Sequence, residues 1–183
     1  ESIGNPAGNV ADLQAVADMA HSHGVPVLVD NTVPTPYLCR PFEHGCDIVA
    51  HSLTKYMGGH GTSIAGMLVD SGKFPWAEHK ERFRRLNEPD VSYHGVVYTE
   101  ALGEAAFIGR ARVVPLRNMG AAISPFNSFL VLQGIETLPV RMDRHCENAL
   151  AVAQYLQNHP QVEWVRYAGL DDNPDRPLID KYM

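Results

Sequence analysis

DIVAHSLTKYMGGHG is the sequence from Asp47 to Gly61, and it joins a short apolar run to a cluster of polar groups. The run 47–50 is typical of a buried strand. Two hydroxyls and a lysine, on Ser52, Thr54 and Lys55, follow the end of this strand, and glycines behind them allow a tight turn. Ligands in open parallel sheets bind at the carboxyl ends of strands. The stretch therefore predicts an α/β fold with a ligand site at this strand end.

Lys55 indicates the class of ligand. A lysine amine can form an imine with an aldehyde cofactor, and neighbouring hydroxyls can hold the phosphate of such a cofactor. Most lysines, however, are solvated surface residues, and a Ser-x-Thr-Lys pattern is short. The local pattern thus leaves two alternatives, a cofactor lysine and a solvated loop lysine.

A second strand ends in an acid. The continuous apolar run 25–29, VPVLV, is typical of a strand covered on both faces, and Asp30 follows it. A carboxylate at that place is costly to desolvate unless a cation meets it, and a pyridinium nitrogen would serve. Alone, Asp30 is equally consistent with a strand-end turn or a helix N-cap. Together with Lys55, at the corresponding end of a strand near in sequence, it favours the cofactor.

These motifs resemble the Cys/Met-metabolism family of fold-type I pyridoxal-phosphate enzymes, and within it most closely the O-acetylhomoserine sulfhydrylases. The resemblance covers essentially the whole chain. The longer segment that contains PDVSYHG at 89–95 favours the sulfhydrylases over the shorter lyases and γ-synthases. The other matching stretches are ES at 1–2, NP at 5–6, VDNT at 29–32, TPYL at 35–38, RP at 40–41, HSLTKY at 51–56, GGHG at 58–61 and RMDRH at 141–145.

The resemblance implies pyridoxal 5'-phosphate as cofactor and a role for each polar residue. Lys55 would bond to the cofactor's aldehyde carbon and later, as a free base, move protons at Cα and C4′. Asp30 would keep the ring nitrogen protonated, so that the ring can accept electrons. Ser52 and Thr54 would donate hydrogen bonds to the phosphate.

The resemblance also implies a reaction. O-acetylhomoserine would lose acetate and gain sulfide at Cγ to give homocysteine, and Glu1 and Asn5 would lie near cofactor and substrate. Plain turn chemistry is the other interpretation of Asn5. The nearest alternative activity is that of another family member, of the cystathionine γ-synthase or methionine γ-lyase type. A non-catalytic structural piece is a further alternative, as is a nucleotide-binding module with 58–61 as its phosphate loop, although its glycines follow the lysine instead of preceding it.

Composition argues against nucleic-acid and membrane partners, and the resemblance implies small-molecule substrates. The chain has 183 residues and a net charge of −6, which argues against nucleic acid. The basic run 80–85 is interrupted by acid and indicates a solvated helix face. No apolar run reaches membrane-spanning length. The resemblance also implies that the protein forms a homo-oligomer, either a dimer or a tetramer.

The three cysteines suit a reducing cytoplasm better than a disulfide framework, because they are odd in number and contain no CxxC pair. A metal site from Cys39, Cys46, His44 and His51 is conceivable. Its spacings match no common zinc pattern, so no metal is expected.

Periodicity predicts alternating helices and strands. An apolar stripe and Gly24 predict a helix at 10–23, Ser124-Pro125 predicts a helix start, and Pro115 is expected to end or kink the helix before it. The family resemblance places a partial cofactor-binding large domain at 1–141 and the start of a small C-terminal domain at 142–183. Expected helices are 10–23, 98–114, 126–133 and about 140–158; expected strands are 25–29, 47–50, 63–69 and 162–165; an extended, partly exposed connection is expected at 73–94.

The chain resembles an internal piece of a longer enzyme. It begins without an initiator methionine, and no position matches the family's upstream phosphate loop, its stacking aromatic or its downstream carboxylate-binding arginine. The chain alone is therefore expected to bind the cofactor weakly, to lack useful activity and to self-associate.

Overall fold

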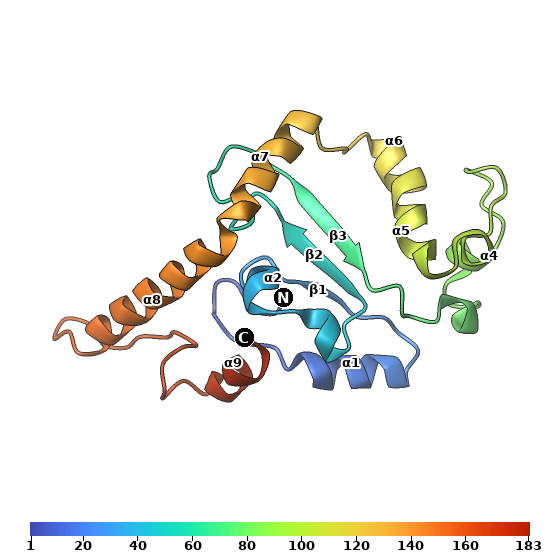
Figure 1. Cartoon of the computed structure of the whole chain (residues 1–183). Coiled ribbons are helices and arrows are strands. Elements are labelled where there is room, and N and C mark those ends of the chain that lie inside the picture. Colours follow the sequence, from blue (N-terminus) through green and yellow to red (C-terminus); the bar gives the residue numbers. More distant parts are fainter.

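The computed structural model describes residues 1–183 and is built around a three-stranded sheet (Figure 1). Strand β2 (Ile48–Ser52) lies in the middle, parallel to β1 (Leu28–Asp30) and antiparallel to β3 (Gly66–Asp70). Neighbouring strand residues face opposite sides of a sheet. Val49 accordingly packs in the cluster that contains Leu13 and Val29, whereas Ile48 packs in an aromatic cluster with Phe74 and Trp76.

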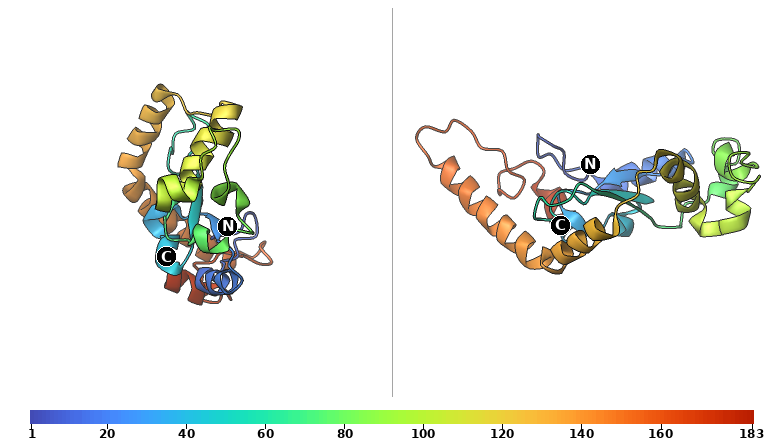
Figure 2. Two further views of the ribbon diagram at one scale, coloured as in Figure 1. Left: turned by 90° about the vertical axis from the view of Figure 1, so that its right-hand side faces the viewer. Right: turned by 90° about the horizontal axis from the view of Figure 1, so that it is seen from above.

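Helices surround the sheet on three sides: α4 to α6 lie on one side, the long arm of α7 and α8 on another, and α1, α2 and α9 beside β1 (Figure 1). Seen from above, the molecule is elongated and bent (Figure 2). The helical elements are α1 (Leu13–Ser22), α2 (Thr35–Leu38), η1 (Pro41–His44), η2 (Trp76–His79), α3 (Arg84–Asn87), α4 (Tyr98–Leu102), η3 (Gly103–Ala105), α5 (Ala106–Ala111), η4 (Arg112–Leu116), α6 (Arg117–Met119), α7 (Pro125–Glu136), α8 (Leu138–Gln157) and α9 (Arg176–Tyr182).

Local signals placed several helix ends correctly. Helix α1 ends before Gly24, whose φ of +63° suits glycine. The Ser124 hydroxyl caps α7 by accepting from the backbone N of Asn127 at 3.1 Å. Helix α7 continues through Gly134, however, and α8 runs unbroken across residues 141 and 142.

The expected doubly covered strand at 25–29 is wrong in two respects. Strand β1 begins only at Leu28, and Leu28 is 54% exposed. Pro26 has no N–H, and the N–H of Val27 donates to the Asp47 carboxylate at 2.7 Å, so neither residue donates to the ladder. The exposed side of Leu28 indicates that this face of the sheet is incompletely covered within the chain.

Three further expectations also need correction. Pro115 does not end its helix, because it lies in the π-helical turn η4, where the N–H of Arg117 reaches back to the carbonyl of Arg112 and the chain continues into α6. The connection 73–94 is not merely extended and exposed, because Phe74, Trp76 and other aromatic side chains there pack in the core. Residues 162–165 are extended but pair with no strand, so no strand forms there.

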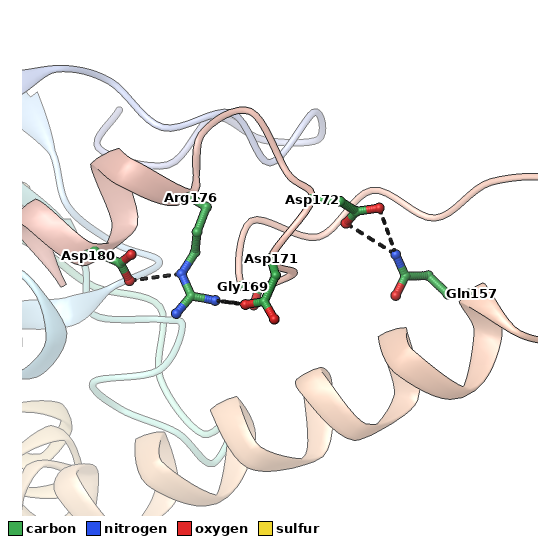
Figure 3. A network of polar contacts seen from close by, with 6 residues as sticks. All are labelled: Gln157, Gly169, Asp171, Asp172, Arg176 and Asp180. Atoms are coloured by element: carbon green, nitrogen blue, oxygen red, sulfur yellow. Dashed lines mark hydrogen bonds and ion pairs between the residues drawn. The ribbon is translucent and has the colours of Figure 1, made fainter.

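The C-terminal segment folds back on the start of the chain. Helix α9 lies beside α1, where the N–H of Gln14 donates to the Tyr182 hydroxyl at 3.1 Å. Arg176, the first residue of α9, forms ion pairs at 2.8 Å with Asp171 in the loop before α9 and with Asp180 in α9 itself (Figure 3). The Gln157 amide at the end of α8 donates to Asp172 in the same loop. These contacts return the chain from the end of the α8 arm to the sheet.

Candidate active site

A cleft of about 640 Å³ opens at the carboxyl ends of β1 and β2. All six residues singled out from the sequence line it, although they come from three separate stretches of the chain. Pockets of about 300–1,000 Å³ suit small ligands. The lining residues are Glu1, Ile3, Asn5, Asp30, Thr32, Val33, Ser52, Thr54, Lys55, Tyr56, Gly59, Gly61, Arg141 and His145.

The parallel register puts Asp30 and Ser52 on the same face of the sheet. Asp30 lies opposite Ala50, and Ser52 is two residues further along β2. Side chains two apart on a strand point to the same side, so the carboxylate and the hydroxyl both face the cleft. His51 lies between Ala50 and Ser52 in β2, so its side chain points to the other face of the sheet. It is 5% exposed, and burial lowers its pKa.

The turn after β1 is fixed by a buried asparagine that the sequence reasoning missed. Asn31 is fully buried, and its amide donates to the carbonyls of Thr35 at 3.1 Å and Cys39 at 2.9 Å. Its Oδ1 accepts from the Ser2 hydroxyl at 2.8 Å. Asp30 itself accepts at Oδ1 from the N–H of Thr32 at 2.9 Å. The carboxylate thus projects from a turn with little freedom to move.

Lys55 lies in a tight turn beyond β2. The N–H of Lys55 donates to the carbonyl of Ser52 at 3.2 Å, and that of Gly59 donates to the carbonyl of Lys55 at 2.8 Å. On either side of the lysine, Leu53 and Met57 are buried against α7 and α8. The lysine side chain is exposed in the cleft, and its amine has no protein partner.

The two hydroxyls expected to hold a phosphate differ in their surroundings. The Thr54 hydroxyl donates to the carbonyl of Ala65 at 3.2 Å and accepts from the N–H of Ala65 at 3.0 Å. The Ser52 hydroxyl has no hydrogen bond, while its backbone N–H donates to the Thr32 hydroxyl at 2.8 Å. Ser52 can therefore donate to a ligand at once, whereas Thr54 would first have to leave Ala65.

The N-terminal residues reach the same cleft. The N–H of Ser2 donates to the carbonyl of Asp30 at 3.0 Å, which ties this stretch to the end of β1. Glu1 and Asn5 line the opening, and the Glu1 carboxylate accepts from the N–H of Asn5 at 2.9 Å. Asn5 thus takes part in a local turn and also borders the cleft, so the two interpretations of this residue are compatible.

The cleft fits pyridoxal phosphate by its donor set. A free amine on Lys55, a carboxylate on Asp30 and an unpartnered hydroxyl on Ser52 match the aldehyde, the ring nitrogen and the phosphate of that group. The metal alternative has no comparable support. No three His, Cys, Asp or Glu side chains lie close enough together to hold a metal ion.

Comparisons with known proteins identify the family. The family model described as "Cys/Met metabolism PLP-dependent enzyme" matches residues 1–183. A protein named homocysteine synthase in Schizosaccharomyces pombe is 51% identical over 184 residues, which cover 100% of this chain and 43% of that protein. An O-acetyl-L-homoserine sulfhydrylase of Leptospira meyeri is 50% identical over 190 residues, with 100% of this chain and 42% of the relative covered.

A solved structure confirms the fold class. A Campylobacter jejuni protein described as an O-acetylhomoserine (thiol)-lyase, which carries N'-pyridoxyl-lysine-5'-monophosphate, superposes with a TM-score of 0.92 at 38% identity. The match covers 100% of this chain and 44% of that one, so this chain has the fold of part of a fold-type I enzyme and spans less than half the length of the relatives it matches. By sequence and by fold, the chain belongs to the Cys/Met metabolism family of pyridoxal-phosphate-dependent enzymes.

Proposed function

We propose that the protein containing this chain converts O-acetylhomoserine and sulfide into homocysteine and acetate. One observation carries the proposal: Asp30, Ser52, Thr54 and Lys55 converge on a single cleft. The names of the relatives that are about half identical to the chain support this reaction. The acetate leaves Cγ with the electron pair of the C–O bond, and sulfide forms the new C–S bond at the same carbon.

Lys55 is the residue that holds the cofactor and moves the protons. When bound, pyridoxal phosphate supplies an electron sink for the electron pair that remains when a proton leaves the substrate. Lys55 would hold the cofactor through its side-chain amine. As a free amine beside the cleft, Lys55 would be the base that takes the proton from the substrate Cα.

Asp30 would hold the ring nitrogen of the cofactor and keep it protonated. A carboxylate favours a cationic partner, and the rigid turn at Asn31 and Thr32 keeps this carboxylate directed into the cleft. Ser52 would donate to the phosphate, and Thr54 could do so as well if its hydroxyl gave up its bond to Ala65. Glu1 and Asn5 line the cleft and would lie near the substrate.

We also propose the larger organisation inferred from the sequence. Residues 1–141 form part of the large domain and residues 142–183 begin the small one, with α8 as the continuous link. The three free cysteines support a cytoplasmic location. None of the helices is both long enough and apolar enough to cross a membrane.

Association of the protein with itself, as a dimer or a tetramer, is supported by an apolar face on α7. Phe126, Phe129 and Leu132 on this helix are 68%, 53% and 61% exposed. We expect Leu132→Glu to lower the mass of the full-length protein measured by light scattering, while Gln161→Glu, an exposed control in the turn after α8, leaves it unchanged. An unchanged mass in the Leu132 variant would show that this face is not the contact.

The function is tested on the full-length protein. We expect visible absorbance with pyridoxal phosphate, a cofactor label on the Lys55 peptide after borohydride reduction, and homocysteine from O-acetylhomoserine and sulfide. A label on another lysine would overturn the assignment of Lys55. Preference for cysteine as the acceptor, or release of methanethiol from methionine, would instead favour the γ-synthase or γ-lyase activity.

A further inference from the structure

Arg141 on α8 binds the backbone of the turn that carries Lys55. Its Nη1 donates to the carbonyl of Tyr56 at 2.9 Å, and the two residues are 85 positions apart in sequence. Its Nη2 donates to the carbonyl of Gly134 at 2.7 Å, and its Nε donates to the Thr137 hydroxyl at 3.1 Å. The guanidinium therefore bridges the residue after Lys55 and the junction between α7 and α8.

Two glycines make this close approach possible. A Cβ on Gly59 would lie 2.5 Å from the Arg141 guanidinium carbon, and a Cβ on Gly134 would lie 2.1 Å from the carbonyl oxygen of Gly58. Neither distance is compatible with a real side-chain carbon. The turn thus lies directly against Arg141 on one side and against the backbone of α7 on the other.

His145 extends the same contact by one helical turn. Residues four apart lie on one face of a helix, so His145 and Arg141 point the same way. The His145 ring meets the Tyr56 ring edge to face, with centroids 5.3 Å apart. Beneath them Leu53 and Met57 pack against Met142. Residue 56 is therefore held through its carbonyl and its ring by the same helix.

We propose that Arg141 is a positioning residue, which fixes the turn 55–59 and thereby the direction of the Lys55 side chain. The consequence for catalysis rests on the proposed function of Lys55. Arg141 lines the cleft, so direct binding of an anionic substrate is the competing role. Three of its five N–H donors are already used on protein oxygens. This geometry favours positioning.

The test uses the full-length protein with Arg141→Ala and Arg141→Lys. Arg144→Ala is the matched control, because Arg144 lies on the same helix and pairs only with the exposed Glu147. In the cofactor-free protein, hydrogen exchange of the amides at 55–59 should quicken in both Arg141 variants and stay unchanged in the control. The lysine of Arg141→Lys keeps the positive charge but cannot reproduce the planar guanidinium and its three hydrogen bonds. It should therefore not restore the protection of the 55–59 amides from exchange.

The kinetic readout separates positioning from substrate binding. We expect kcat to fall by about 10- to 100-fold in Arg141→Ala with little change in the KM for O-acetylhomoserine, because misplacement by about 1 Å can cost a hundredfold. Millimolar guanidinium should restore part of kcat in this variant and none in the control. Unchanged hydrogen exchange at 55–59 in the Arg141 variants would overturn the proposal. If the KM for O-acetylhomoserine also rose, direct substrate binding would be the role of Arg141 instead.

Failure of the proposed function gives a different result. In that case the wild-type protein carries no cofactor on Lys55, while the exchange comparison still reports on the Arg141 contacts. If Arg141→Ala does not fold, Arg141→Lys provides both the exchange and the kinetic comparison.

Discussion

Replacing Asn31 should cost more stability than any exposed polar substitution in this chain. Asn31 is 0% exposed, and its side chain makes three hydrogen bonds, to Ser2, Thr35 and Cys39. Each is worth about 1 kcal/mol net, and an unpaired buried partner costs more. Asn31→Ala should therefore lower the free energy of unfolding by about 3 kcal/mol or more. That is a large share of the ~5–15 kcal/mol that stabilises a typical protein.

Asn31→Asp is the sharper form of the same test. It keeps the shape and the oxygen that accepts from Ser2, but it places an oxygen against two carbonyls where the amide NH₂ had donated. The loss should thus be at least as large as in the alanine variant, although the volume is unchanged. The same change should loosen the turn that directs Asp30 and weaken binding of pyridoxal phosphate.

Urea unfolding of the cofactor-free full-length protein measures the effect, since bound cofactor would break two-state behaviour. Asn127→Ala is the matched control, because the side chain of this asparagine on α7 makes no hydrogen bond; only its backbone N–H is bonded, to Ser124. If Asn31→Ala and Asn127→Ala differed by less than about 1 kcal/mol, the buried network would not have the importance given to it here.

Other expected outcomes concern single side chains. Ser52→Ala should weaken cofactor affinity more than Thr54→Val in an absorbance titration, because only Ser52 has a free hydroxyl; equal losses would contradict this. Burial lowers the pKa of His51, so the unfolded chain binds its proton first and stability should fall as the pH drops through the ordinary histidine pKa of about 6.5. Urea midpoints for His51→Asn should show a smaller fall. Burial raises the pKa of Cys39 and of Cys46 to about 11. Iodoacetamide at about pH 8 should therefore label both only after unfolding, and later than the less buried Cys146. Rapid labelling of Cys39 or Cys46 in the native protein would refute this.

Asp30 and Lys55 are the site residues that the sequence pattern itself predicts, because they lie near strand ends, whereas Glu1 and Asn5 are expected only from the family resemblance. Asp30 and Lys55 each follow a short apolar run, and a run of that kind is a local signal. The parallel pairing of β1 and β2 then brings the two strand ends together in the structure. Short-range sequence pattern and the usual placement of ligands in α/β sheets are enough to predict that these two strand ends lie close together.

The error at 25–29 occurred where a distant contact overrides a local rule. Val27 has the composition of a strand residue, but its N–H is taken by the carboxylate of Asp47, twenty positions away. That group lies outside the window in which hydrophobic periodicity is read. At Pro115 the cause is local: α5 ends at Ala111, and the N–H of Arg117 bonds the carbonyl of Arg112 across a π-helical turn that contains the proline, so the chain stays helical.

Arg141 is the clearest case of a site residue that local pattern cannot reveal. An arginine on a long helix is most often a solvated charge, and the periodicity around Arg141 gives no other indication, although RMDRH at 141–145 is among the stretches that resemble the family. Only the fold brings it to Tyr56, and only the absent Cβ atoms of Gly59 and Gly134 let the three segments approach. The glycines are therefore the sequence signal that was available. GGHG predicts a tight turn or, in the alternative, a phosphate loop; Gly59 has a φ of +72°, as such a turn requires, and the Arg141 guanidinium also lies against it. A glycine beside a candidate catalytic lysine is thus a reason to look for the distant side chain that needs the space.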